Sequence, residues 1–153
     1  MALYLVQHGK NLPKGIDPDK GLSSKGFSDV KRIADVAKGY NVRVSCIKHS
    51  GKKRAKQTAE IFALALKPEK GVRKSDGLDP MDDVSCFAEK INNSDNLMLV
   101  GHLPFMERLA TYLITGSVDR PVFKFQNGGI VSMDIDPGSH FWVIKWALMP
   151  EIG

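Results

Sequence analysis

Three apolar segments of this chain stop abruptly at polar side chains that are able to do chemistry. The first, residues 3–6, leads into His8, and the second, residues 97–100, leads into His102. The third, residues 42–47, leads into a basic turn that ends at Arg54. Short apolar runs bounded by glycine and polar residues are typical of buried strands. Because open α/β sheets bind ligands at the carboxyl ends of their parallel strands, the two histidines and the basic turn are predicted to lie at one edge.

Segments with helical spacing of apolar residues alternate with these strands. The clearest helix follows Ser23 or Ser24, either of which can cap it, and ends at Gly39. Further helices are predicted over residues 55–66, 84–91 and 104–114, and further strands near Val72 and over residues 122–125, 129–135 and 141–148. The last two strands are expected to form a hairpin. This alternation predicts an α/β fold, a three-layer α/β/α sandwich with a mostly parallel central sheet and an antiparallel edge.

Length and composition favour an ordinary globular domain. The chain has 153 residues, 42% hydrophobic and 25% charged, and is predicted to form one domain over residues 1–153. Its net charge of +5 favours anionic partners without choosing among them. Neither a signal peptide nor a membrane-length apolar run is evident, so we expect a cytoplasmic protein with no membrane partner. Cys46 and Cys86 form no CxxC pair and are expected to be free buried thiols, with no metal or cofactor.

The two histidines and the basic turn suit phosphoryl transfer. A neutral imidazole is a good nucleophile toward phosphorus and forms an intermediate that water can hydrolyse. The transition state spreads negative charge over three oxygens, and the planar guanidinium of Arg54 is a suitable fixed donor to them. His102 becomes a second donor if a bound anion holds it protonated. The helix that follows Ser50, its expected cap, offers unpaired amide groups to an anion.

The same residues resemble the signature of the histidine phosphatase superfamily, and the chain looks like its small SixA-type phosphohistidine phosphatases. Six pieces occur in the family's order over nearly the whole chain. They are Leu5-Val6-Gln7-His8-Gly9, Leu22-Ser23-Ser24-Lys25-Gly26, Ser50-Gly51-Lys52-Lys53-Arg54-Ala55-Lys56-Gln57-Thr58, Leu78-Asp79-Pro80, Val100-Gly101-His102 and Trp146-Ala147-Leu148-Met149-Pro150. The resemblance implies a phosphoglycerate mutase-like fold, with His8 as the nucleophile, Arg54 as the phosphate clamp and His102 as the second catalytic histidine.

Two positions depart from the family pattern. Gln7 stands where the family has arginine, and Gly51 stands where it has proline. Glutamine donates hydrogen bonds but carries no charge, and loss of one transition-state donor costs other enzymes about 10²–10³ in rate. Either a neighbouring cation, Lys10 or Lys52, takes the arginine's place, or the chain has kept the phosphate pocket and lost most of its turnover. Gln7, Lys10 and Lys52 are therefore candidate substrate-binding residues.

No residue in the sequence is clearly the acid that protonates the leaving group. Larger members of the family use a glutamate after the second helix, where this chain has Asp76, Asp79, Asp82 and Asp83. The favoured interpretation of these aspartates is a solvated acidic loop. A phosphohistidine substrate lessens the need for an acid, because solvent can protonate its nitrogen before it leaves.

Three functions are compatible with these residues. The first is a phosphatase acting on phosphohistidine in a protein, or on a small phosphoester, through an intermediate on His8. The second is a catalytically weakened phosphate- or phosphoprotein-binding module on the same fold. The third, nucleic-acid binding, rests only on charge and lacks interleaved aromatic residues, so no nucleic-acid partner is expected. His49 and His140 have no partner at metal-ligand spacing and are predicted to be surface or loop residues. The loop 10–21 is long enough that we expect it to cover something.

Overall fold

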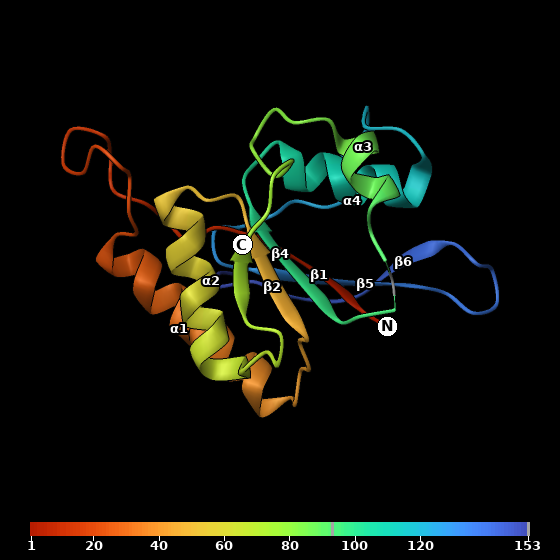
Figure 1. The fold of residues 1–153 in the computed structure, drawn as a ribbon, viewed down its shortest axis with the longest axis horizontal. Helices are drawn as coiled ribbons and strands as arrows, with labels where there is room; N and C mark the ends of the chain where they lie inside the picture. The colour runs from red at the N-terminus through yellow and green to blue at the C-terminus, as the bar shows by residue number, and fades with distance from the viewer. Residues whose placement is uncertain (93, 153) are drawn as a thin grey trace.

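A six-stranded sheet in the order β3-β2-β4-β1-β5-β6 lies between two pairs of helices (Figure 1). It belongs to a computed structural model that describes residues 1–92 and 94–152. The elements in chain order are β1 Leu3–Gln7, α1 Ser24–Gly39, β2 Cys46–His49, α2 Lys53–Leu66, β3 Val72–Lys74, α3 Val84–Glu89, β4 Leu97–Gly101, α4 Phe105–Thr115, β5 Ile130–Ile135 and β6 Trp142–Leu148. The predicted three-layer α/β/α sandwich is confirmed.

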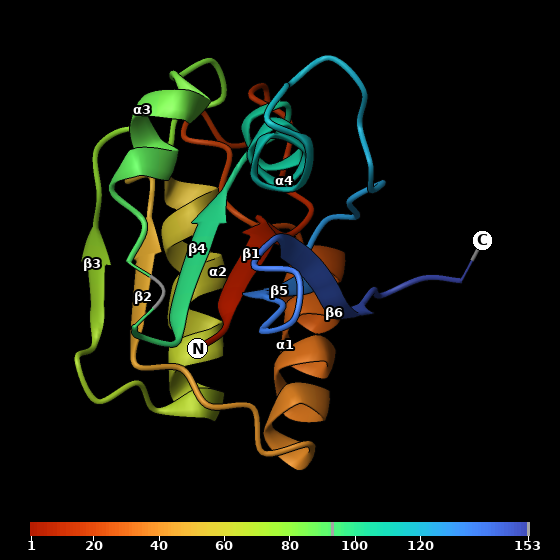
Figure 2. The same ribbon diagram turned by 90° about the vertical axis from the view of Figure 1, so that its right-hand side faces the viewer.

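The direction of the connections changes between the neighbouring strands β1 and β4. Strands β3, β2, β4 and β1 are parallel, whereas β5 pairs antiparallel with β1, and β6 pairs antiparallel with β5. Figure 2 spreads the strands out from β3 to β6. The chain leaves β1 for α1 on one face of the sheet and leaves the neighbouring β4 for α4 on the other face. Adjacent parallel strands that are continued on opposite faces leave a ligand-sized crevice between their carboxyl ends.

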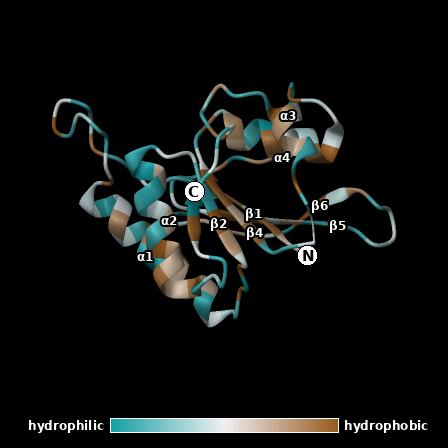
Figure 3. Cartoon of the chain, in the orientation of Figure 1, coloured by the Kyte–Doolittle hydropathy of each residue, from teal (hydrophilic) through white to brown (hydrophobic). Residues whose placement is uncertain are grey.

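The residues of β1 alternate between two hydrophobic cores. Tyr4 and Val6 pack with residues of α1 and α2, whereas Leu3 and Leu5 pack with Phe105 and other residues of α4. Because both faces of β1 are covered, its sequence is a continuous apolar run rather than an alternating one. Figure 3 shows α1 and α2 in both hydrophilic and hydrophobic colours, as expected for helices with one face on the sheet and one in water.

Two strand predictions are wrong. Residues 122–125 form bends and irregular backbone instead of a strand. Their aromatic side chains pack locally, since the rings of Phe123 and Phe125 meet edge to face with centroids 5.6 Å apart. Strand β2 starts at Cys46 instead of Val42, because the amide of Val42 donates to a carbonyl of α1 and closes that helix.

The ends of the helices mostly follow their capping residues. The hydroxyl of Ser23 accepts a hydrogen bond from the amide of Gly26 at 3.0 Å, which confirms the cap predicted for α1. Helix α3 ends at Glu89, two residues before its predicted end. Cys46 is buried as expected, but Cys86 is exposed, because it lies on the outer side of a short surface helix. Within residues 1–92 and 94–152, every helix is too short or too polar to cross a membrane.

The loop over residues 10–21 is fastened to the first turns of α2. Asp17 accepts a hydrogen bond from the ammonium of Lys53 at 2.9 Å, and this contact lowers the pKa of the Asp17 carboxyl to about 2. The amide of Leu22 donates to the side-chain oxygen of Gln57 at 2.7 Å. The loop therefore lies beside α2 and extends away from the sheet, as Figure 1 shows.

Candidate active site

The ends of β1 and β4 bring the two histidines together. The amide of His8 donates to the carbonyl of Gly101 at 2.9 Å, so the parallel pairing of the strands continues up to this residue. The ring centroids of His8 and His102 lie 5.0 Å apart, and the ring planes are tilted by 51°. The two residues are only 8% and 1% exposed. Both imidazoles therefore lie at the carboxyl ends of these two strands, with little contact with water.

His8 presents a free ring nitrogen. Its Nδ1 lies 2.7 Å from the carbonyl oxygen of Gly9, and because a carbonyl can only accept, Nδ1 carries the proton. Nε2 is then left with its lone pair. Burial lowers the pKa of His8 to about 4, assisted by the charge of Arg54 and opposed by the hydrogen bond to Gly9. The ring is neutral at pH 7, which is the state a nitrogen nucleophile requires.

Two contacts from distant parts of the chain hold the turn at His8. The buried hydroxyl of Thr58 accepts the amide hydrogen of Gly9 at 2.9 Å and donates to the carbonyl of Arg54 at 2.8 Å. The side chain of Asn127 donates to the carbonyl of His8 at 2.9 Å. The nucleophile turn is thus tied both to the first turn of α2 and to the chain that enters β5.

Arg54 supplies positive charge to both histidines. It lies in the first turn of α2, and its guanidinium contributes to the lowered pKa values of His8 and His102. Burial lowers its own pKa, opposed by the carboxylate of Asp79. A partly desolvated guanidinium, forked and planar, is well suited to bind phosphate oxygens.

The structure separates the two candidate lysines. The charge of Lys52 contributes to the lowered pKa of His102. Lys10 instead lines a small pocket of about 250 Å³ together with Asn127 and the chain near Glu151. Lys52 is therefore the better placed of the two to add charge at the histidines.

His102 is hydrogen-bonded to Ser50. The hydroxyl of Ser50 lies 2.6 Å from Nε2 of His102, and it also accepts the amide hydrogen of Lys52 at 3.3 Å. Burial lowers the pKa of His102 to about 3, with further contributions from His8, Arg54 and Lys52. The expectation that Ser50 caps α2 is wrong, because the residue at the cap position is Lys52, which makes no side-chain capping bond.

Gln7 is buried at the end of β1, opposite Gly101 in the pairing with β4. Among the described residues, its side-chain oxygen Oε1 has no hydrogen-bond partner. A buried amide oxygen without a partner is uncommon and unfavourable. The position that carries arginine in the family signature is thus occupied here by an uncharged amide at the base of the crevice.

The turn after β2 also differs from expectation. His49, predicted to lie at the surface, is only 5% exposed, because it is the last residue of β2 and its Nδ1 accepts the amide hydrogen of Gly51 at 3.0 Å. Gly51 has a φ of +95°, which a proline cannot adopt. The glycine in place of the family's proline therefore gives this turn a different backbone. His140 is exposed in the β5–β6 turn, as predicted.

Three residues of the site were not predicted in these roles. Ser50 was expected to cap a helix and appeared, like Thr58, as part of a motif, whereas Asn127 carried no signal at all. Their roles come from hydrogen bonds that span 52, 49 and 119 positions of the chain. Within the part of the chain that the structure describes, the His, Cys, Asp and Glu side chains form no group able to hold a metal ion.

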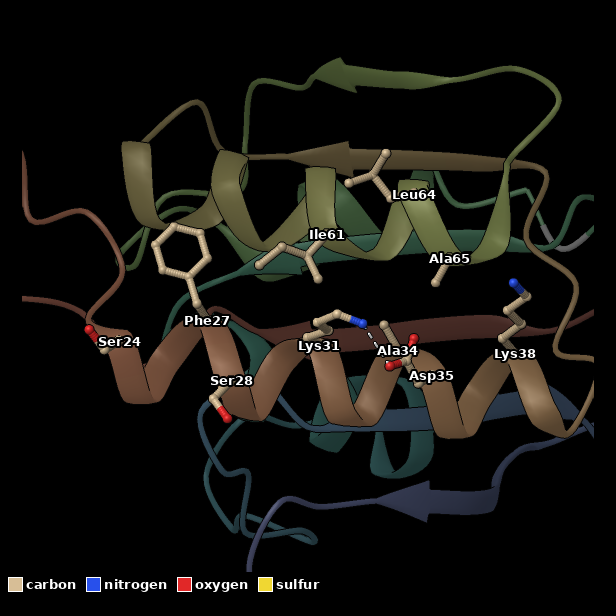
Figure 4. A pocket seen from close by; sticks show the side chains of 10 residues that line it. All are labelled: Ser24, Phe27, Ser28, Lys31, Ala34, Asp35, Lys38, Ile61, Leu64 and Ala65. Atoms are coloured by element: carbon tan, nitrogen blue, oxygen red, sulfur yellow. Dashed lines mark hydrogen bonds and ion pairs between the residues drawn. The ribbon is translucent and has the colours of Figure 1, made fainter.

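A separate groove of about 790 Å³ lies between α1 and α2, away from the histidines (Figure 4). Phe27 of α1 and Ile61 of α2 line it, and the ion pair of Lys31 with Asp35 lies on its α1 side. None of the candidate site residues contributes to its lining. The larger of the two pockets described here therefore contains none of the candidate catalytic residues.

Comparison with known proteins identifies the fold. A scan against protein-family models finds no match, and neither does a search among curated proteins. Among solved structures, the histidine phosphatase SixA complexed with tungstate superposes with a TM-score of 0.81 at 23% identity, over 98% of this chain and 97% of SixA. An Agrobacterium tumefaciens protein assigned as the phosphohistidine phosphatase SixA gives 0.78 at 25% identity, over 98% of both chains. Phosphoserine phosphatase from Entamoeba histolytica gives 0.70 at 15% identity, over 95% of both chains.

The chain therefore has the fold of the histidine phosphatase superfamily. Within that superfamily, its structural neighbours include the small SixA proteins, whose length it matches almost completely.

Proposed function

We propose that this chain is a phosphatase that uses His8 as its nucleophile. The observation that carries the proposal is the hydrogen bond from Nδ1 of His8 to the carbonyl of Gly9, which leaves Nε2 unprotonated beside Arg54. The similarity in fold to several phosphatases supports it independently. At this level of identity the similarity concerns the fold, so the argument for activity rests on the site.

The proposed reaction has two steps. Nε2 of His8 attacks phosphorus, the Nε2–P bond forms, and the bond from phosphorus to the leaving group breaks. Water then attacks the phosphohistidine, the Nε2–P bond breaks, and inorganic phosphate is released. Arg54 and Lys52 balance the charge on the phosphoryl oxygens in both steps, aided by the amide groups at the start of α2.

The proposed substrate is a phosphohistidine side chain of a protein, with a small phosphoester as the alternative. Phosphohistidine requires little help in leaving, because solvent can protonate its nitrogen. Among the four aspartates, Asp79 is the one whose carboxylate charge acts on Arg54. Gln7 and Lys10 are also proposed to contact the substrate. The cytoplasmic location expected from the sequence stays a prediction.

A catalytically weakened phosphate-binding module is the second candidate. The observation that favours it is Gln7, a buried uncharged amide at the position where the family signature has arginine. Such a module would still bind phosphate or a phosphoprotein through Arg54. It would lack the charge needed for fast turnover.

The decisive experiment is phosphate release from a phosphohistidine-bearing protein by wild type and by His8→Ala. We expect turnover by wild type, an acid-labile phosphoenzyme on rapid quenching, and loss of both in the variant. His140→Ala, which removes an exposed histidine from a distant turn, is the matched control and should retain full activity. Release by His8→Ala at the wild-type rate would refute the assigned nucleophile. Absence of release by wild type that still binds phosphate would favour the binding module.

A further inference from the structure

Three exposed lysines lie around the turn that joins β2 to α2, beside the candidate active site. Lys52 immediately precedes α2, Lys56 follows it by four positions within the helix, and Lys74 is the last residue of β3. These three residues are called the lysine patch below. Only Lys52 belongs to the proposed phosphate-binding residues, so the other two lysines have no part in the chemistry at His8.

His49, the last residue of β2, connects the helix and the edge strand. It is the register partner of Lys74 in the parallel pairing of β2 with β3. Burial lowers the pKa of the His49 ring, and the charges of Lys56 and Lys74 lower it further, opposed by Glu60. Two lysines that are far apart in the sequence therefore act on one imidazole.

A glycine lets the side chain of Lys74 lie against the turn that leads to Lys52. A Cβ atom at Gly51 would lie 2.7 Å from Cε and 3.0 Å from Cδ of Lys74, so any other residue at this position would displace the lysine. The family pattern has proline where this chain has Gly51. This departure thus allows a cation of the edge strand to cross the turn before α2.

The lysine patch lacks counter-charges within the protein. Among the described residues, none of its three lysines forms an ion pair, whereas the neighbouring Lys53 pairs with Asp17 at 2.9 Å. Lys52 and Lys56 are four positions apart, a spacing at which like charges on a helix repel. The first turn of α2 has no acidic residue, although the helix dipole disfavours cations there. This arrangement is unfavourable in the free protein, and an anionic partner would relieve it.

The position of Lys74 favours a partner larger than a small phosphoester. The strands lie in the order β3-β2-β4-β1, so β3 is three strands away from the strand that leads to His8. Each strand lies about 4.8 Å from the next, which puts β3 about 14 Å from β1. A protein surface around a phosphorylated residue covers that distance, whereas a small phosphoester bound at His8 does not.

We propose that the lysine patch is a docking surface for acidic side chains that surround the phosphorylated residue of a protein substrate. This inference rests on the proposed function and adds to it the kind of protein that is selected. Charges at the rim of an interface act mainly on the association rate and on specificity. The patch therefore favours phosphoproteins with carboxylates beside the phosphoryl group over equally phosphorylated proteins without them.

A nucleic acid fits the lysine patch less well than an acidic protein does. Single strands are bound through aromatic side chains on which bases stack, in addition to positive charge. The exposed aromatic side chains Phe27, Tyr40 and Phe141 lie on α1, directly after α1 and in the β5–β6 turn, not beside the three lysines.

The test compares the hydrolysis of two phosphohistidine peptides, one with glutamates around the phosphorylated residue and one with glutamines in their place. Exposed ion pairs of this number predict that wild type has about 3- to 30-fold higher kcat/KM for the glutamate peptide at low salt. The preference should largely disappear at about 0.5 M salt, because screening weakens exposed charge pairs. Equal kcat/KM values for the two peptides at low salt would overturn the proposal.

Neutralising the two lysines outside the site should remove this preference. The double variant Lys56→Gln/Lys74→Gln should lose the preference through a higher KM for the glutamate peptide and should hydrolyse the glutamine peptide as wild type does. Lys38→Gln/Lys145→Gln is the matched control, since it removes the same charge from exposed positions at the end of α1 and on β6, and it should keep the preference. An unchanged preference in the first variant, or an equal loss in both, would overturn the proposal.

Two further measurements separate charge from packing and from nucleic-acid binding. Lys56→Arg/Lys74→Arg retains both charges and should keep the preference, and a loss in this variant would show that the packing of Lys74 on Gly51 is responsible instead. A short DNA duplex that inhibits wild type more strongly than the unphosphorylated glutamate peptide does would make a nucleic acid the partner. Either result would overturn the proposal.

Binding of the unphosphorylated glutamate peptide, measured by fluorescence anisotropy, separates the docking surface from the chemistry. If wild type binds this peptide more tightly than Lys56→Gln/Lys74→Gln does but releases phosphate from neither phosphopeptide, only the proposed phosphatase function is overturned. If wild type hydrolyses both phosphopeptides equally well, only the docking surface is overturned. Absence of both binding and release would overturn both proposals.

Discussion

Replacing Thr58 by valine should loosen the nucleophile turn without creating a cavity. Thr58 is fully buried, and its hydroxyl accepts the amide hydrogen of Gly9 at 2.9 Å. Valine has nearly the same volume but leaves that amide buried without a partner, which costs about 1–3 kcal/mol. The carbonyl of Arg54, the other partner of the hydroxyl, keeps its bond within the helix. We therefore expect the free energy of unfolding to fall by about 1–3 kcal/mol in urea titration, with an unchanged m value.

The same substitution should reduce activity more than its effect on stability explains. Thr111 in α4 offers a matched control, because its buried hydroxyl donates to the carbonyl of Glu107 at 2.8 Å and accepts the amide of Val122 at 3.3 Å. Thr111→Val should lose similar stability but keep its rate of phosphate release. Thr58→Val should release phosphate at least tenfold more slowly, because the orientation of His8 depends on the Gly9 turn, and a shift of reacting groups by about 1 Å can cost about 10² in rate. Equal rates in the two variants, or a stability loss below about 0.5 kcal/mol for Thr58→Val, would refute this reasoning.

Three further predictions concern charge, pH and packing. Because the charge of Lys52 reaches His102, Gln7→Arg should change kcat/KM less than tenfold, and a gain of about 10² would instead show that Gln7 limits turnover. The acid limb of the kcat/KM profile, corrected for substrate ionisation, should have its midpoint near 4, the pKa of His8, and a midpoint near 6.5 would contradict a buried neutral nucleophile. The pKa of His8 is about 4 in the folded protein and about 6.5 in the unfolded chain, so the unfolded chain takes up this proton first as the pH falls. The free energy of unfolding should therefore decrease from about pH 6.5 toward pH 4. Gly26→Ala should destabilise the protein by about 1–3 kcal/mol in thermal unfolding, although alanine has the better helix propensity, because its Cβ would clash with the backbone oxygen of Lys10. Gly39→Ala is the control, since Gly39 has open space around it, and this variant should be as stable as wild type or more stable.

The sequence was most informative where burial dictates the pattern. Residues 3–6 of β1 are all apolar because helices cover both faces of the strand, and this run predicted a central parallel strand that leads into His8. The prediction failed where an apolar residue has another structural use. Phe123 and Phe125 pack against each other in irregular backbone, although their alternation is typical of a strand. Val44 is buried but lies before the start of β2.

The candidate site was predictable to the extent that its chemistry is charged or titratable. His8, His102 and Arg54 follow strands or begin a helix, so their approximate positions could be derived from the order of the elements. The neutral residues that position them could not be predicted in the same way, since a serine or asparagine hydrogen bond across the fold leaves no local pattern. The burial of His49 could not be predicted from the sequence either. Strand β2 continues two residues beyond its last apolar residue, Ile47, and this extension buries the polar side chain of His49.

The pairing of β1 also determines when this site can form during synthesis. Strand β1 pairs with β4, which begins at Leu97, and with β5, which begins at Ile130. About 90 residues therefore separate the strand that carries His8 from its first partner, and a ribosome adding about 5–20 residues per second needs several seconds to make them. Until β4 has been made, the apolar residues of β1 have neither of these strands to pair with. A chain released before residue 97 therefore could not form the site.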